Sequence, residues 1–144
     1  MIIPLEQYKQ ALDTLPILCV DLLLQNKEGE YLLVYRNNEP LKGEWWVPGG
    51  RIHKTESVMV SARRKCQEEL GLGISSFEVV GFLEEFFEDA PFGVQSGFHA
   101  VSIVLHAVID TNKIKLDQQS ENWKFSKELP PRIKIQPFQK GSFL

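Results

Sequence analysis

The stretch VPGGRIHKTESVMVSARRKCQEELGL, residues 47–72, places a Gly-Gly turn directly before a segment with the spacing of a helix. Apolar residues recur at every fourth position and predict one buried helical stripe, made of Val58, Ala62, Cys66 and Leu70 with Met59 beside it. Thr55 is predicted to cap the helix, with Glu56 in its first turn and Gly71 as its stop. The stretch therefore predicts a tight loop that runs directly into an amphipathic helix.

The other face of this helix carries four charged residues, Arg64, Lys65, Glu68 and Glu69. Arg64 with Glu68 and Lys65 with Glu69 are i,i+4 pairs, so one interpretation is a solvated face whose salt bridges contribute roughly a few tenths of a kcal/mol each. The other interpretation is a metal site, because loop carbonyls and carboxylates one helical turn apart can converge on a hard cation such as Mg²⁺. The spacing of the whole stretch favours the second interpretation.

That spacing is Gly50, five residues, Glu56, seven residues, Arg64, and then Glu68-Glu69-Leu70-Gly71-Leu72. The pattern resembles the Nudix box. The resemblance implies the Nudix fold, an α/β/α sandwich with a mixed sheet, in a single domain over residues 1–144. It also implies Mg²⁺-dependent hydrolysis of a nucleoside diphosphate linked to another group, with Mn²⁺ as the alternative metal. In the family, Glu56 would hold the loop to the helix and Arg64 would orient a carboxylate of the box.

One residue departs from the box, because Lys65 stands where the family has a metal-binding Glu. A cluster of two or three metal ions is therefore less expected here. The longer stretch over residues 14–72 is similar to the GDP-mannose mannosyl hydrolase branch, which also lacks that Glu and uses one Mg²⁺. That branch releases GDP and a free sugar, so the resemblance implies a GDP-sugar as substrate. It implies metal ligands at the Gly49 carbonyl, Glu69 and Gln119, and substrate contacts at Asp21, Arg36 and Arg51.

The identity of the catalytic base is open, because the branch has a His beside its metal-binding Gln and this chain has Ser120 there. A serine is not a base near neutral pH. Attack at the sugar carbon would need a carboxylate of the same loop, Asp117 or, preferably, Glu121. Attack at phosphorus would instead use Glu68, which in typical family members ligates metal or serves as base. The candidate catalytic residues are accordingly Glu68, Glu121, Arg36 and Arg64.

Asp21 and Arg36 have physical reasons of their own to belong to a site. Asp21 lies within the apolar run ILCVDLLLQ, and a buried carboxylate needs a partner such as a sugar hydroxyl or a guanidinium group. A structural salt bridge is the alternative. Arg36 and Arg51 would suit a diphosphate as fixed cations, although Arg36 could simply end a strand at the surface. Of Trp45 and Trp46, one is expected in the core, and the other could stack on a base or pack in a dimer contact.

The rest of the chain alternates strand signals with turns. The pattern predicts a short helix over residues 5–13 and strands over 17–25, 31–36, 77–87, 97–109 and 122–126. Cys19 and Cys66 both lie inside apolar segments and are predicted to be small core residues.

Composition narrows the class of partner. A net charge of −3 over 144 residues argues against a broad basic surface for nucleic acid. The first residues contain no long apolar run, which predicts neither a signal peptide nor a membrane span and favours a cytoplasmic location. The expected partner is a small-molecule nucleotide, and a homodimer is expected. Two other functions stay open: a MutT-type pyrophosphohydrolase acting on nucleoside triphosphates or other diphosphates, and a non-catalytic nucleotide-sugar sensor.

Overall fold

The computed structural model of the protein describes residues 2–110 and 122–139. The helical segments are α1 (Leu5–Thr14), α2 (Val58–Leu70) and the 3₁₀ turn η1 (Pro91–Gly93). The strands are β1 (Ile17–Gln25), β2 (Tyr31–Tyr35), β3 (Trp45–Trp46), β4 (Gly49–Arg51), β5 (Glu78–Phe87), β6 (Phe98–Val108), β7 (Trp123–Ser126) and β8 (Gln136–Pro137). The predicted first helix and the five predicted strands are confirmed to within one residue at each end. The short strand β3 lies in the stretch LKGEWWVPGG, residues 41–50, where the resemblance to the family implies a strand and a turn before the box. The short strands β4 and β8 were not predicted.

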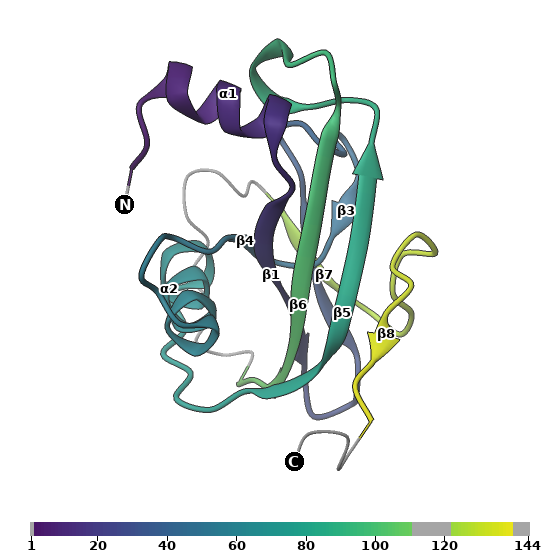
Figure 1. Ribbon diagram of the computed structural model, residues 1–144. Helices are drawn as coiled ribbons and strands as arrows, with labels where there is room; N and C mark the ends of the chain where they lie inside the picture. Colours follow the sequence, from purple (N-terminus) through teal and green to yellow (C-terminus); the bar gives the residue numbers. More distant parts are fainter. Residues whose placement is uncertain (1, 111–121, 140–144) are drawn as a thin grey trace.

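The strands form one mixed sheet in the order β3-β2-β1-β6-β5-β8, with β4 paired to β1 and β7 paired to β2 (Figure 1). β1 and β6 run parallel at its centre, and the other pairs are antiparallel. β1 is buried along nearly its whole length, as expected for a central strand covered on both faces. In register, Asp21 of β1 lies between Gly49 of β4 and Val104 of β6.

Side chains alternate along β1, so its two faces belong to different clusters. Val20, Leu22 and Leu24 pack with the α2 stripe of Ala62, Cys66 and Leu70. Cys19, on the other face, packs with Leu12 of α1 and Ala100 of β6. The α/β fold with a mixed sheet is therefore confirmed, as is the prediction that Cys19 and Cys66 are buried core residues.

The start of α2 differs from the prediction. Ser57, not Thr55, is the cap, and its hydroxyl accepts a hydrogen bond from the Val60 amide at 3.1 Å. Thr55 has a φ of 74°, and Glu56 lies before the helix instead of in its first turn. The reason is that Glu56 closes a turn onto His53, since the Glu56 amide donates to the His53 carbonyl at 3.0 Å. The end of α2 is as predicted, with Gly71 in the left-handed conformation.

One residue of the tryptophan pair lies in the core, as predicted. Trp46 is 6% exposed and belongs to the cluster on the face of the sheet away from α2. Trp45 is half-buried instead, with the Lys124 ammonium 4.4 Å from its ring centre and the Tyr35 ring at its edge. In the described residues Trp45 therefore stacks with side chains of the chain itself.

Candidate active site

A cavity of about 260 Å³ lies where the short strand β4 pairs with β1. It gathers five of the residues predicted for the site, Asp21, Arg36, Gly49, Arg51 and Glu69, together with Lys65. Arg64 and Glu68 do not line it. The predictions of a metal ligand and of a base also involved four residues that lie outside the described residues, namely Asp117, Gln119, Ser120 and Glu121.

The Gly-Gly pair of β4 allows three elements to approach closely at this cavity. A Cβ on Gly49 would meet the Val20 carbonyl oxygen and would lie 2.7 Å from Oδ1 of Asp21. A Cβ on Gly50 would lie 2.8 Å from Cε of Lys65. The clash at Gly49 involves backbone atoms of β1, so only glycine fits there, whereas at Gly50 a side chain would require the end of Lys65 to move.

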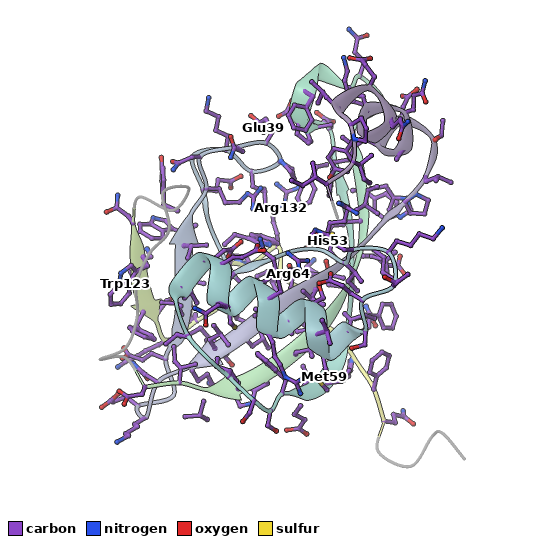
Figure 2. The ribbon with its side chains drawn as sticks, turned by 90° about the vertical axis from the view of Figure 1, so that its left-hand side faces the viewer. Glu39, His53, Met59, Arg64, Trp123 and Arg132 are labelled. Atoms are coloured by element: carbon purple, nitrogen blue, oxygen red, sulfur yellow. The ribbon has the colours of Figure 1, made fainter. Side chains whose placement is uncertain are left out.

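Arg64 connects the loop, β4 and α2 at the back of this edge. Its Nε donates to Oε2 of Glu56 at 2.7 Å, and its Nη2 donates to the Arg51 carbonyl at 3.0 Å. Its Nη1 donates to Oε2 of Glu68 at 3.2 Å. In Figure 2, Arg64 lies on α2 beside the loop that carries His53, whose amide donates to Glu56 Oε1 at 2.7 Å. These contacts match the expectation that Arg64 pairs with carboxylates of the box.

The Arg64 guanidinium holds the pKa of the Glu56 carboxyl at about 2, well below its ordinary value of 4.5. The hydrogen bond from the His53 amide acts in the same direction, while burial acts against it. Glu56 is therefore ionised over the whole physiological range. Its carboxylate holds the loop and the helix together.

Lys65 pairs with the next carboxylates along α2. Its Nζ lies 2.8 Å from Oε1 of Glu69 and 3.8 Å from Oε2 of Glu68. The Lys65 and Glu69 side chains are only 16% and 15% exposed, and Arg64 is 21% exposed, whereas Glu68 is 51% exposed. The interpretation as a solvated face is therefore wrong for three of the four charged residues. It holds only for Glu68.

Arg36 follows β2 and enters the cavity because its loop folds back on it. Its Nε donates to the Pro40 carbonyl at 2.6 Å, and its backbone amide donates to the backbone carbonyl of Glu44 at 2.9 Å. The alternative that Arg36 merely ends a strand at the surface is therefore wrong. Arg51, from β4, places its guanidinium carbon 5.5 Å from the centre of the Tyr8 ring. Together with Lys65, these two residues give the cavity three cations from three elements.

The sheet contributes polar residues to the cavity that the sequence analysis missed, namely Glu85 of β5 and Ser102 of β6. Asp21 was predicted, and it is 6% exposed, with a pKa that burial raises above its ordinary value. Strand alternation could have identified Glu85, because of the adjacent Glu84 and Glu85 only one can face solvent. For Ser102 no local signal was available. Within the described residues Asp21 forms no ion pair, so a structural salt bridge is not what holds it there.

The NUDIX domain family matches residues 15–141. The chain belongs to this family. Low-salt glycan biosynthesis protein Agl8 of Haloferax volcanii is 29% identical over 136 residues, which are 94% of this chain and 85% of that protein.

Solved structures support the same fold. A MutT NUDIX hydrolase from Burkholderia pseudomallei has a TM-score of 0.67 at 21% identity, covering 83% of this chain and 90% of that one. The NUDIX domain of NrtR from Shewanella oneidensis, solved in complex with ADP ribose, has a TM-score of 0.62 at 23% identity. That alignment covers 85% of this chain and 82% of the NrtR chain.

Nudix hydrolases generally use divalent metals, so the donor groups of this Nudix domain can be tested for fit. Oxygen donors suited to Mg²⁺ line the cavity, namely the Gly49 backbone and the Glu69 carboxylate. The Lys65 ammonium already stands as a cation 2.8 Å from Glu69. In the described part of the chain no group of three or more His, Cys, Asp and Glu side chains could hold a metal. Among the described residues, Gly49 and Glu69 could therefore supply oxygen ligands to a single ion if Lys65 moved away, and no set of side chains suits a cluster of ions.

Over residues 2–110 and 122–139, no helix has both the length and the apolar character needed to cross a membrane.

Proposed function

We propose that this Nudix domain is a Mg²⁺-dependent hydrolase of a nucleoside diphosphate linked to a sugar, with GDP-sugars as the first candidates. The observation that carries the proposal is the convergence of Arg36, Arg51 and Lys65 on the cavity that also holds Gly49 and Glu69. A diphosphate is the anion that such a set of fixed cations suits, since Arg binds phosphate through a planar fork and Lys as a point charge.

Two relatives lend support to the sugar. Agl8 is named for glycan biosynthesis, in which sugars are transferred or processed. The NrtR domain was solved with ADP ribose, which is itself a nucleoside diphosphate joined to a sugar. The proposal that the base is guanine is supported only by the resemblance of residues 14–72 to the GDP-mannose mannosyl hydrolase branch.

The proposed roles follow the position of each residue. The Gly49 carbonyl and Glu69, with Gln119, would hold one Mg²⁺, which when bound neutralises the diphosphate and stabilises the leaving group. Arg36 and Arg51 would bind the oxygens of the diphosphate. Arg64 would act through its neighbours, because it positions the β4 backbone through the Arg51 carbonyl.

The position of Glu68 bears on which bond is cleaved. Attack at phosphorus needs a base beside the diphosphate, but Glu68 is half-exposed, does not line the cavity and is engaged by Arg64. This arrangement favours attack at the sugar carbon, with water losing its proton to Glu121 and the nucleoside diphosphate leaving with the bond electrons. The products would then be GDP and the free sugar.

The experiment is hydrolysis of GDP-sugars, UDP-sugars and nucleoside triphosphates with Mg²⁺ in ¹⁸O-labelled water. Label in the free sugar with unlabelled GDP supports attack at carbon. GMP and a sugar phosphate as products would show that the diphosphate is cut, as in a MutT-type pyrophosphohydrolase, with Glu68 as the candidate base. Turnover of triphosphates alone would remove the sugar from the proposal.

A nucleotide-sugar sensor is the second candidate, and the Lys65–Glu69 ion pair is the observation that favours it. An ammonium group on the expected metal carboxylate competes with a divalent ion for the same oxygen. Tight binding of GDP-sugars without any turnover in Mg²⁺ or Mn²⁺ would support this function and exclude the hydrolase.

A further inference from the structure

Three buried polar atoms of the sheet have no hydrogen-bond partner within the described residues. They are Oδ2 of Asp21, Oε1 of Glu85 and Oγ of Ser102. Asp21 is 6% exposed and Ser102 is fully buried. The three groups are neighbours, since burial raises the pKa of Asp21 while hydrogen bonding with Glu85 and with Ser102 acts against that effect, but these three atoms make no hydrogen bond of good geometry in the described part of the chain. A buried polar group left unsatisfied costs roughly 1–3 kcal/mol, so such a cluster is unexpected in a part of the fold that serves only stability.

The three residues lie on one face of three neighbouring strands. Ser102 of β6 pairs in register with Cys19 of β1 and with Leu83 of β5. Because side chains alternate, Asp21 lies on the face of Cys19 and Glu85 on the face of Leu83. All three line the same cavity as Arg36, Arg51 and Lys65. We refer to Asp21, Glu85 and Ser102 as the polar floor of the cavity.

The charge of the polar floor determines what it can bind. A phosphate is repelled by a carboxylate such as that of Asp21, so the anionic part of a ligand belongs with the cations Arg36, Arg51 and Lys65. Burial, and then the neighbouring Asp21 carboxylate, raise the pKa of Glu85 well above its ordinary value. A carboxylate accepts hydrogen bonds, a protonated carboxyl and a serine hydroxyl both donate and accept, and neutral hydroxyl groups match this set.

Part of the cavity wall is apolar, and Trp46, Phe87 and Phe98 contribute to it. Binding sites for small molecules commonly combine such a wall with a few polar groups that fix orientation. A site built to hydrogen-bond hydroxyl groups also rejects analogues that lack them, because its buried polar groups are then left unpaired.

We propose that Glu85 and Ser102 complete, with Asp21, a subsite that binds and selects the hydroxyl groups of the sugar, in the same cavity as the cations that bind the diphosphate. This inference rests on the proposed function, because it assigns the hydroxyl groups of that substrate to the polar floor and its diphosphate to the cations. Glu85 and Ser102 are thereby specificity-determining residues that lie outside the Nudix box.

The test is titration calorimetry of GDP-mannose and of GDP in EDTA, which withholds the metal needed for turnover. Glu85→Gln and Ser102→Ala are compared with Glu84→Gln, a matched change of the adjacent exposed residue on β5. Glu85→Gln is expected to weaken GDP-mannose at least about tenfold while GDP stays within about twofold. Ser102→Ala is expected to act in the same direction with a smaller loss. Glu84→Gln is expected to change neither affinity.

An equal loss for both ligands, or no loss for either, overturns the subsite. A lowered thermal midpoint of Glu85→Gln together with equal losses would assign the residue a structural role instead. A wild-type protein that binds neither nucleotide overturns both the subsite and the proposed function. Selective loss of GDP-mannose binding in a protein that never hydrolyses it with Mg²⁺ would leave the subsite standing and remove only the hydrolase function.

Discussion

The ion-pair network on α2 and the polar floor of the sheet lie beside the same cavity. They differ in whether their polar groups have partners within the protein. On α2, Arg64 bonds to Glu56 and Glu68, and Lys65 pairs with Glu69. On the floor, Asp21, Glu85 and Ser102 each keep an atom without a partner in the described residues. Polar groups that are all paired with one another can stabilise the fold. Buried polar groups without a hydrogen-bond partner are instead available to bind a ligand.

The largest effect is expected where the α2 network meets the cavity. Glu69→Gln should lower kcat/KM with a GDP-sugar and Mg²⁺ by about a thousandfold, because it removes the carboxylate proposed to hold the ion. Steady-state kinetics over a Mg²⁺ series measures it. Glu68→Gln, one residue earlier on α2 and outside the cavity, is the control and should lose about tenfold or less. If Glu68→Gln is the more damaging change, attack at the sugar carbon is the wrong mechanism.

The second largest effect is expected in the free energy of unfolding, to which the α2 network contributes. Arg64→Met removes the hydrogen bonds to Glu56, Glu68 and the Arg51 carbonyl and leaves Glu56 without its guanidinium partner, so it should lower the free energy of unfolding by about 2–3 kcal/mol. Arg63→Met, a neighbouring change on α2, loses only an exposed contact to the Ser75 carbonyl and should cost less than about 1 kcal/mol. Urea unfolding at neutral pH measures both. Equal costs would show that the Arg64 network adds nothing to the fold.

The pH dependence of stability should have opposite signs in the two regions. The pKa of Glu56 is lowered, so its contribution is present above pH 4.5 and is lost as the pH falls toward about 2. The pKa of Glu85 is raised, so its cost is absent at pH 4.5 and grows as the pH rises above that value. Glu85→Gln should therefore gain about 1 kcal/mol over wild type near pH 8 and nothing near pH 4.

Urea midpoints across this pH range measure the effect. Glu56→Gln is the opposite control, because it should lose stability above pH 4.5 and converge on wild type at low pH. A Glu85→Gln protein that is less stable than wild type at pH 8 would show that the Glu85 carboxyl has a stabilising partner in the folded protein. The polar floor would then stabilise the fold, as the α2 network does.

The sequence predicted one of these regions much better than the other, for a physical reason. Glu56, Arg64 and Glu68 lie within one loop and one helix, so spacing along the chain fixes their proximity. Glu85 and Ser102 meet Asp21 only through the pairing order of three strands that are far apart in sequence. The predicted cap at Thr55 failed for a related reason, since the Glu56 turn onto His53 takes precedence over local cap preference.

The smallest expected effect compares two serines. Ser57→Ala removes the hydroxyl that accepts from the Val60 amide at the start of α2, and should cost about 1 kcal/mol of stability. Ser102→Ala removes a hydroxyl that has no partner in the described residues, and should cost close to nothing. Thermal and urea unfolding of the two variants measure the difference. A larger cost at Ser102 would mean that its hydroxyl is already satisfied in the folded protein.

The Gly49–Gly50 edge of β4 brings both faces of the sheet to one opening. Lys65 reaches it from the α2 face across Gly50, while Asp21 reaches it from the other face beside Gly49. A ligand lodged there would hold the two hydrophobic layers together and restrain local opening of each. Amide hydrogen exchange should then slow in α2 and in β5 at the same ligand concentration, even though the two elements lie in different layers.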